Sequence, residues 1–209
     1  MNLELYNLSR RSWILALCCG LSKSGFTPLK SDLLHKVLFF ANCLSPIYKQ
    51  SPPSNLVMKH RRGPFYPTAQ HDLDRLAIQG FLSITDFRYE SDTNGVWTYA
   101  NYSVNTSGAE FVKTLTKFNK WNKIVKYLDD IAYAYSEIQS EISEKINDYD
   151  LTYNSPGKSL NDVIDFSKIE LNYSARTSKA FFRISPSVLI PYSRDVLVLY
   201  MKFLESKAA

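Results

Sequence analysis

The first 45 residues contain two stretches in which apolar residues recur at helical spacing. The first runs from Trp13 to Leu21 and is almost free of polar residues, which predicts a buried helix. A polar break containing Gly25 follows. In the second stretch, from Pro28 to Ala41, apolar residues stand every three or four positions with charged residues between them. This pattern predicts an amphipathic helix that begins at Thr27-Pro28, because proline suits the first helical turn.

Residues 67–108 show a helical pattern followed by a strand pattern. Pro67 opens an amphipathic helix that Gly80 closes as a C-terminal cap. Two segments rich in β-forming residues follow, at 81–87 and 96–102, and Asn94-Gly95 between them is a strong signal for a hairpin turn. Residues 49–66, which precede this helix, are predicted to form a loop.

The resulting order is three helices, a two-stranded ribbon and another helix, which is the order of a winged helix. Two local patterns agree: Leu76-x-x-x-Gly80-Phe81-Leu82, where a helix gives way to a strand, and Tyr102-x-Val104-x-x-x-Gly108, where the ribbon leads into a helix. The expected fold class is therefore mainly α (α+β), with a winged-helix domain over residues 1–115 whose ribbon is the wing. An unrelated helical fold with one hairpin is the alternative.

Residues 116–209 are expected to form a long amphipathic helix and a small helical C-terminal extension. Apolar residues recur from Phe111 to Ile146 at steps of three and four, which fits one long helix or two helices with a break near Phe118-Asn119. The other side of this stretch is acidic and is expected to be solvated. Further on, Ser159 is expected to cap a short helix through Phe166, and Ser193 a last helix. The sequence does not indicate a role for residues 150–209.

The 209-residue chain has a net charge of +5, which is unevenly distributed. Residues 1–65 carry nine Lys or Arg and two Asp or Glu, whereas residues 66–150 carry eight and thirteen. The densest basic cluster is Lys59-His60-Arg61-Arg62, and Arg10 and Arg11 add two further cations. This group predicts contacts to the phosphates of double-stranded DNA without reading of the base sequence. The alternative is a solvated loop that binds nothing.

The polar side of the third predicted helix carries Gln70, Asp72, Asp74 and Arg75. Carboxylates in a major groove are repelled by the phosphates and accept hydrogen bonds only from cytosine amino groups. These four residues are therefore expected to bind a protein partner with a basic surface. The fourteen tyrosines and three tryptophans favour the same interpretation, because such residues are enriched at interfaces.

Motifs for catalysis or cofactor binding do not occur in the sequence. It contains no glycine-rich phosphate loop, no His-Glu-x-x-His zinc motif and no Gly-x-Ser-x-Gly nucleophile motif. His35 is expected on a helix surface, and Cys18, Cys19 and Cys43 are expected in the core of a protein from a reducing compartment. No run of about 18 apolar residues is present to span a membrane. The expectation is a cytoplasmic, non-enzymatic binding protein without metal or cofactor.

Part of the chain resembles a family of bacterial defence proteins. The residues that carry the resemblance are Gly63-Pro64, Asp72-Leu73-Asp74-Arg75-Leu76 and Gly80-Phe81-Leu82. They resemble a pattern in the small middle subunits of three-component anti-phage systems built around an ABC-type ATPase, including Lamassu-type systems. The similar region covers about residues 10–115.

The resemblance implies a non-catalytic accessory subunit that bridges an SMC-like ATPase and an effector, often a nuclease, in an anti-phage complex. It implies no catalytic residue. Two other functions stay open. One is a winged-helix transcriptional regulator, which would dimerise and protect a specific operator. The other is an antitoxin or adaptor of a toxin–antitoxin system, because related Gly-Pro-x-Asp-Leu patterns occur in Panacea-type domains.

Overall fold

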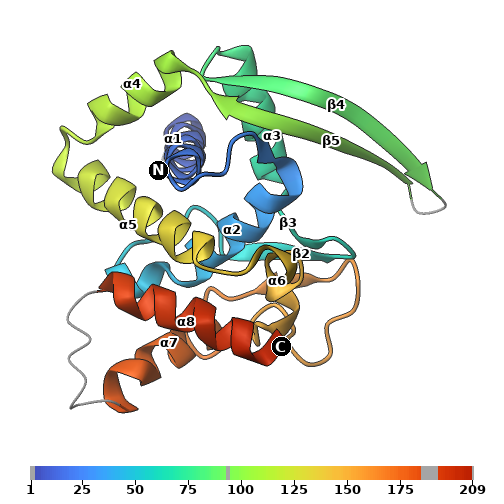
Figure 1. Ribbon diagram of the computed structural model, residues 1–209, viewed down its shortest axis with the longest axis vertical. Helices are drawn as coiled ribbons and strands as arrows, with labels where there is room; N and C mark the ends of the chain where they lie inside the picture. Colours follow the sequence, from blue (N-terminus) through green and yellow to red (C-terminus); the bar gives the residue numbers. More distant parts are fainter. Residues whose placement is uncertain (1–2, 93–94, 185–192, 209) are drawn as a thin grey trace.

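The computed structural model describes residues 3–92, 95–184 and 193–208. It is a mixed α+β molecule in which helices surround a buried first helix and two small antiparallel sheets lie at its periphery (Figure 1). The expected mainly helical α+β class is therefore confirmed.

Helix α1 (Leu3–Lys23) is the central element of the upper half of the molecule (Figure 1). It packs against α3 (Pro67–Ile78), α4 (Thr106–Leu115) and α5 (Asn119–Ser136). Because neighbours cover it on several sides, residues 13–19 and Leu21 are buried irrespective of their position around the helix. At Gly20 a Cβ atom would lie only 3.2 Å from the carbonyl oxygen of Leu128, so glycine allows the close approach of α5.

Helix α2 (Ser31–Cys43) begins later than the sequence predicts. The predicted start at Thr27-Pro28 is wrong, because Leu29 and Lys30 form the short strand β1 and pair with Tyr102 and Asn101. The expected exposed polar side of this helix is also wrong, because every residue from Leu34 to Cys43 is buried, His35 and Lys36 included.

The predicted hairpin is confirmed. Strands β4 (Leu82–Asp92) and β5 (Gly95–Val104) pair antiparallel, and the first sheet has the order β1-β5-β4. The expected turn residue Asn94 lies outside the described residues. The ribbon is long and curved and extends well beyond the body (Figure 1). Its pairing register shifts between Thr85 and Arg88, where Asp86 takes a φ of 52°.

Two glycines explain how the chain enters and leaves this ribbon. Gly80 has a φ of 77°, a left-handed conformation that ends α3 as predicted. Gly108 lies in the first turns of α4, where a Cβ atom would come within 2.5 Å of the carbonyl oxygen of Phe81. The glycine in each of the two local patterns therefore meets a backbone requirement that other residues do not meet.

The second sheet was not predicted. The segment expected to be a loop, residues 49–66, follows the short helix η1 (Ser45–Tyr48) and contains the hairpin of β2 (Leu56–His60) and β3 (Gly63–Phe65). Strand β6 (Val163–Asp165) adds to β2, which gives the order β3-β2-β6. The helix expected from Ser159 to Phe166 is therefore wrong, because Ile164 is buried in this sheet opposite Val57.

The long apolar stripe from Phe111 to Ile146 is divided into separate helices. Helix α4 ends at Leu115 and α5 begins at Asn119, as in the two-helix alternative with a break near Phe118-Asn119. Two short elements follow, α6 (Ser140–Ser143) and η2 (Ile146–Tyr149). The helices α7 (Tyr173–Ile184) and α8 (Ser193–Ala208) then form the lower part of the molecule (Figure 1).

The division of the chain at residue 115 stays a prediction. Across this position α1 packs on α5, and β2 pairs with β6. The residues before and after it therefore contribute to common layers.

Candidate partner-binding site

The predicted cationic and anionic residues near α3 meet in one buried cluster. Asp72 is only 1% exposed, and its carboxylate accepts hydrogen bonds from the Nε atoms of Arg10 and Arg11, the latter at 3.2 Å. Asp72 therefore does not belong to an exposed docking surface, which corrects its expected role. The Nε atoms of Arg10 and Arg11 are used in the contact between α1 and α3, and the predicted DNA contact of these two residues stays a prediction.

The basic cluster of residues 59–62 does not present four cations to solvent. The Lys59 ammonium donates to the side chain of Asn154 at 3.1 Å and to the carbonyl of Lys158 at 3.3 Å. His60 is buried, and burial together with the neighbouring arginines lowers its pKa. The Arg62 guanidinium stacks over the ring of Tyr99 at 4.4 Å, whereas Arg61 is exposed. The predicted DNA contact at this loop stays a prediction, with Arg61 as its exposed member.

The outer side of α3 carries the remaining predicted partner-binding residues. Asp74 and Arg75 are exposed, and Gln70 is half-buried. The Gln70 amide donates to the hydroxyl of Tyr102 at 2.8 Å and to Asp74 at 3.3 Å. The bond to Tyr102 joins α3 to strand β5, whereas the bond to Asp74 lies within α3.

An apolar groove lies between α3 and the ribbon and was not predicted from the sequence. Its volume is about 570 Å³, and its lining includes Ala77, Ile78, Ile84, Phe87 and Tyr102 with Asp74 at its polar side. Ile78 is 82% exposed and Phe87 is 65% exposed. The shift in register beside Asp86 is a β-bulge, a device that redirects side chains, and Phe87 follows it directly. The sequence signal for the groove is the run of three consecutive apolar residues Leu76, Ala77 and Ile78. Three consecutive residues do not all lie on one face of a helix, so one of them is expected to point away from the core.

A smaller pocket adjoins the groove. It has a volume of about 180 Å³ and lies between α2, the β2–β3 hairpin and β5. Its polar lining residues are Ser31, Asp32, His35, His60, Arg62, Gln70, Thr98 and Tyr99. Gln70 lines both this pocket and the groove. Thr98 also lines both, so the two cavities share two side chains.

His35 is buried in this pocket, so its expected place on a helix surface is wrong. The backbone N–H of Tyr66 donates to its Nδ1 at 3.3 Å, and Nε2 lies 3.3 Å from the side-chain oxygen of Gln70. Nδ1 is thus an acceptor and the proton of the neutral ring is on Nε2. Burial lowers the pKa of His35 to about 4, which keeps the ring neutral at physiological pH.

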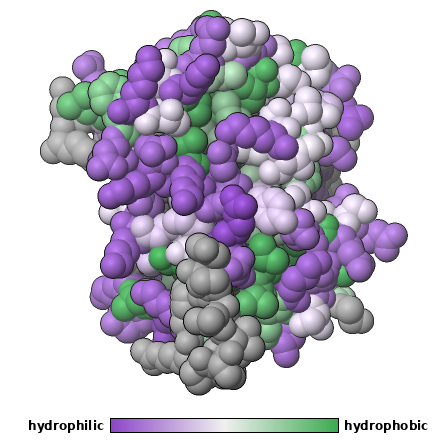
Figure 2. All heavy atoms as spheres, turned by 60° about the vertical axis from the view of Figure 1, so that its left-hand side comes forward, coloured by the Kyte–Doolittle hydropathy of each residue, from purple (hydrophilic) through white to green (hydrophobic). Residues whose placement is uncertain are grey.

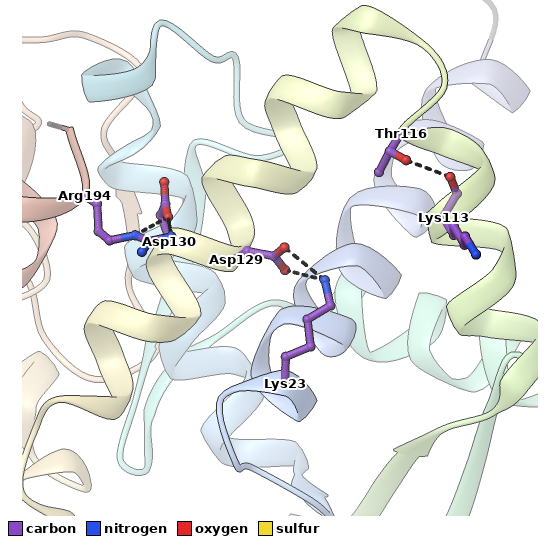
Figure 3. Close-up of polar contacts among 6 residues, drawn as sticks. All are labelled: Lys23, Lys113, Thr116, Asp129, Asp130 and Arg194. Atoms are coloured by element: carbon purple, nitrogen blue, oxygen red, sulfur yellow. Dashed lines mark hydrogen bonds and ion pairs between the residues drawn. The ribbon is translucent and has the colours of Figure 1, made fainter.

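The acidic side expected along α5 is partly used inside the molecule. Figure 3 shows Asp129 paired with Lys23, at 3.0 Å, and Asp130 paired with Arg194, at 2.5 Å. Asp130 is buried and also accepts a hydrogen bond from the Tyr48 hydroxyl at 2.7 Å. It is therefore a structural residue that joins η1, α5 and α8, and not part of a solvated face.

The structure describes possible metal ligands and the state of the three cysteines. Among residues 3–92, 95–184 and 193–208, no group of three His, Cys, Asp or Glu side chains could hold a metal ion. Cys18, Cys19 and Cys43 are buried and unbridged, which confirms them as core residues. Burial raises the pKa of the Cys19 thiol to about 11, so this thiol is a poor nucleophile. Among the described residues, no helix is both long enough and apolar enough to span a membrane.

No protein-family model matches the chain, and no curated protein or solved structure is significantly similar to it. The arguments for its function therefore rest on the groove, the pocket and the charges described above.

Proposed function

We propose that this chain is a non-catalytic accessory subunit that binds a partner protein in the groove between α3 and the β4–β5 ribbon. In the setting implied by the family resemblance, the partners are an SMC-like ATPase and an effector, and the complex acts against phage in the bacterial cytoplasm. The resemblance and the groove are independent arguments for this proposal.

The observation that carries the proposal is the convergence of exposed apolar side chains on one groove. Single exposed apolar residues are common on protein surfaces, whereas several that line one depression are typical of interaction sites. Here Ile78 from α3 and Ile84 and Phe87 from β4 line the same groove. Asp74 lies at its polar side, so the groove suits a partner segment with apolar side chains and an adjacent Lys or Arg.

The fold of residues 1–115 supports a winged-helix reading within this proposal. Three helices, α1, α2 and α3, precede a ribbon, and the sheet order β1-β5-β4 places a short strand before α2 beside the second ribbon strand. The β2–β3 hairpin is then an insertion between the second and third helices of that arrangement.

A winged-helix transcriptional regulator is the second candidate, since the same helix and sheet order favours it. The surface of α3 favours it less. Asp74 would face the phosphates with a like charge, and Ile78 would bring an apolar side chain to a polar groove of DNA. The antitoxin or adaptor alternative uses the same apolar groove with a toxin as the partner.

The deciding experiment is affinity purification of the full chain from cells that also express the products of its neighbouring genes. Recovery of a large ATPase supports the proposal, and loss of that recovery in the variants Ile78→Asp and Phe87→Asp assigns the contact to the groove. A buried charge at an interface hot spot is expected to weaken binding by at least ~30-fold. Leu160→Asp is the matched control, because Leu160 is 58% exposed and lies outside the groove.

Three outcomes would count against the proposal. Purification without any ATPase rejects the defence-complex setting. Unchanged recovery with Ile78→Asp and Phe87→Asp rejects the groove. Protection of a specific operator by a dimer of the chain, or neutralisation of a toxic neighbour in a one-to-one complex, favours the regulator or the antitoxin instead.

A further inference from the structure

Five exposed lysines follow one another around the corner between α4 and α5. We name them the lysine row: Lys113, Lys117, Lys120, Lys123 and Lys126. No Asp or Glu occurs between residues 111 and 128, so the row is a local excess of five positive charges. Figure 2 shows the molecule from the side of α4 and α5, and hydrophilic side chains cover much of this face.

The charges of the lysine row are not used inside the molecule. Within the part of the chain that the structure describes, none of the five ammonium groups has a hydrogen bond or an ion pair. Figure 3 shows the contrast. Lys23 and Arg194 contact carboxylates, whereas the ammonium of Lys113 points away from its neighbours. The Thr116 hydroxyl donates to the backbone oxygen of Lys113 and not to its side chain. Unpaired cations close together create a positive potential that attracts a polyanion.

The arrangement suits a regular anionic backbone. Lys120, Lys123 and Lys126 are three residues apart on α5, so each is turned by about one-sixth of a turn from the last, and the three extend over about 9 Å of the helix. Lys117 lies between α5 and α4, and Lys113 lies near the end of α4, so the charge continues onto that helix. Because α4 and α5 form an outer corner of the molecule (Figure 1), nothing in the described chain covers the row from outside.

We propose that the lysine row binds the phosphate backbone of double-stranded nucleic acid without reading its sequence. Lysine is a point charge on a flexible stem and neutralises phosphates without demanding a fixed geometry. Asn119 and Asn122 are exposed within the row and supply further donors for phosphate oxygens. This contact lies on different elements from the predicted contact at residues 59–62 and from the groove of the proposed function.

A duplex fits this surface better than a single strand or a membrane does. Binding of single strands relies on aromatic side chains on which successive bases stack. Here Phe118 is 61% exposed, but Trp121 packs against the core, so the described corner offers one such ring and not a platform. A single ring is also too little apolar surface to anchor the corner in a bilayer.

The test measures binding of the full chain to a random-sequence DNA duplex of about 25 base pairs by fluorescence anisotropy at several salt concentrations. Each phosphate neutralised contributes about −0.9 to the slope of log affinity against log salt, so five lysines give at most about −4.5. The variant Lys117→Glu/Lys120→Glu/Lys123→Glu should bind at least ~10-fold more weakly at about 50 mM salt. Its slope should be smaller by about 2.7.

A matched control separates a local site from the effect of net charge. The variant Lys145→Glu/Lys168→Glu/Lys179→Glu changes the same number of exposed lysines away from α4 and α5. It should keep affinity within about threefold. All six substituted positions are exposed, and melting curves of both variants should match that of the unchanged chain.

Four results would overturn the inference. One is an equal loss of binding in the two triple variants. Another is a loss of duplex affinity in Arg61→Glu/Arg62→Glu with no loss in the lysine-row variant, which would assign the contact to residues 59–62. The third is tighter binding of a single strand that weakens with Phe118→Ala. The last is binding to vesicles with anionic lipids and none to the duplex.

Discussion

At the scale of single residues, burial keeps the His35 ring neutral, and both of its nitrogens make polar contacts. The Tyr66 amide donates to Nδ1, and Nε2 faces the side-chain oxygen of Gln70. A proton added to Nδ1 would turn this acceptor into a donor that faces another donor. Burial is the main cause that lowers the pKa of His35 to about 4, and the hydrogen bond to Gln70 opposes this shift.

This depressed pKa makes the stability of the protein depend on pH in a defined window. The unfolded chain takes up the proton near pH 6.5 and the folded chain near pH 4, so the unfolded state binds more protons between these values. The contribution of the neutral His35 ring to the free energy of unfolding is therefore fully present above pH ~6.5. It is lost as the pH falls toward ~4. Between pH 7 and pH 5 the loss due to His35 should be about 2 kcal/mol.

Urea unfolding of the unchanged chain and of His35→Gln at both pH values measures this loss as a difference. The variant should show a smaller drop in the free energy of unfolding than the unchanged chain. His71→Gln is the matched control, because His71 is exposed on α3. An equal drop in all three proteins would show that carboxylates, and not His35, cause the acid sensitivity.

At the scale of elements, the contact between α1 and α3 depends on one buried carboxylate shared by two arginines. Asp72 is almost fully buried, while Arg10 and Arg11 retain partial access to water. Removal of one partner from a buried ion pair is strongly destabilising, because it leaves the other charges without compensation. Partial exposure of the arginines reduces this cost but does not remove it.

Asp72→Ala should therefore lower the free energy of unfolding by about 2–3 kcal/mol. The matched control is Asp74→Ala, two residues further along the same helix, where the carboxylate is exposed and a change within about 1 kcal/mol is expected. Chemical unfolding followed by circular dichroism compares them. Equal effects of the two substitutions would mean that the cluster of Asp72 with the arginines contributes nothing special to the α1–α3 contact.

The elements that the sequence predicted correctly are those defined by nearby residues. The periodicity of α1, α2 and α3, the cap at Gly80 and the β4–β5 hairpin all depend on spacings of a few residues. The second sheet was missed because β2 finds its partner β6 about 100 residues later, and because three-residue strands carry no usable alternation.

The candidate site was predicted less well, for the same physical reason. The sequence treats Asp72 and Asp74 alike, yet the arginines of α1 bury one of them and leave the other at the groove. The lysine row was hidden by averaging, since residues 66–150 have more acidic than basic residues as a whole. Charge has to be counted along single helices before it indicates a surface.

At the scale of the whole molecule, the proposed surfaces lie on separate elements around α1. The groove is formed by α3 and the β4–β5 ribbon, and the lysine row by α4 and α5 (Figure 1). Helix α1 packs against α3, α4 and α5, so it fixes the two surfaces relative to each other without belonging to either. This arrangement suits a subunit that holds a protein and a duplex at the same time.

The two surfaces should therefore act independently. Ile78→Asp/Phe87→Asp should abolish recovery of the partner and leave duplex affinity within about threefold, and the lysine-row variant should do the reverse. In the combined variant, the loss of partner recovery and the loss of duplex affinity should each equal the loss in the corresponding single variant. Sites without shared contacts have independent effects to within about 0.5 kcal/mol. Partner purification and duplex anisotropy on all four proteins measure this. Loss of duplex binding in the groove variant alone would mean that the ribbon, and not the α4–α5 corner, contacts the nucleic acid.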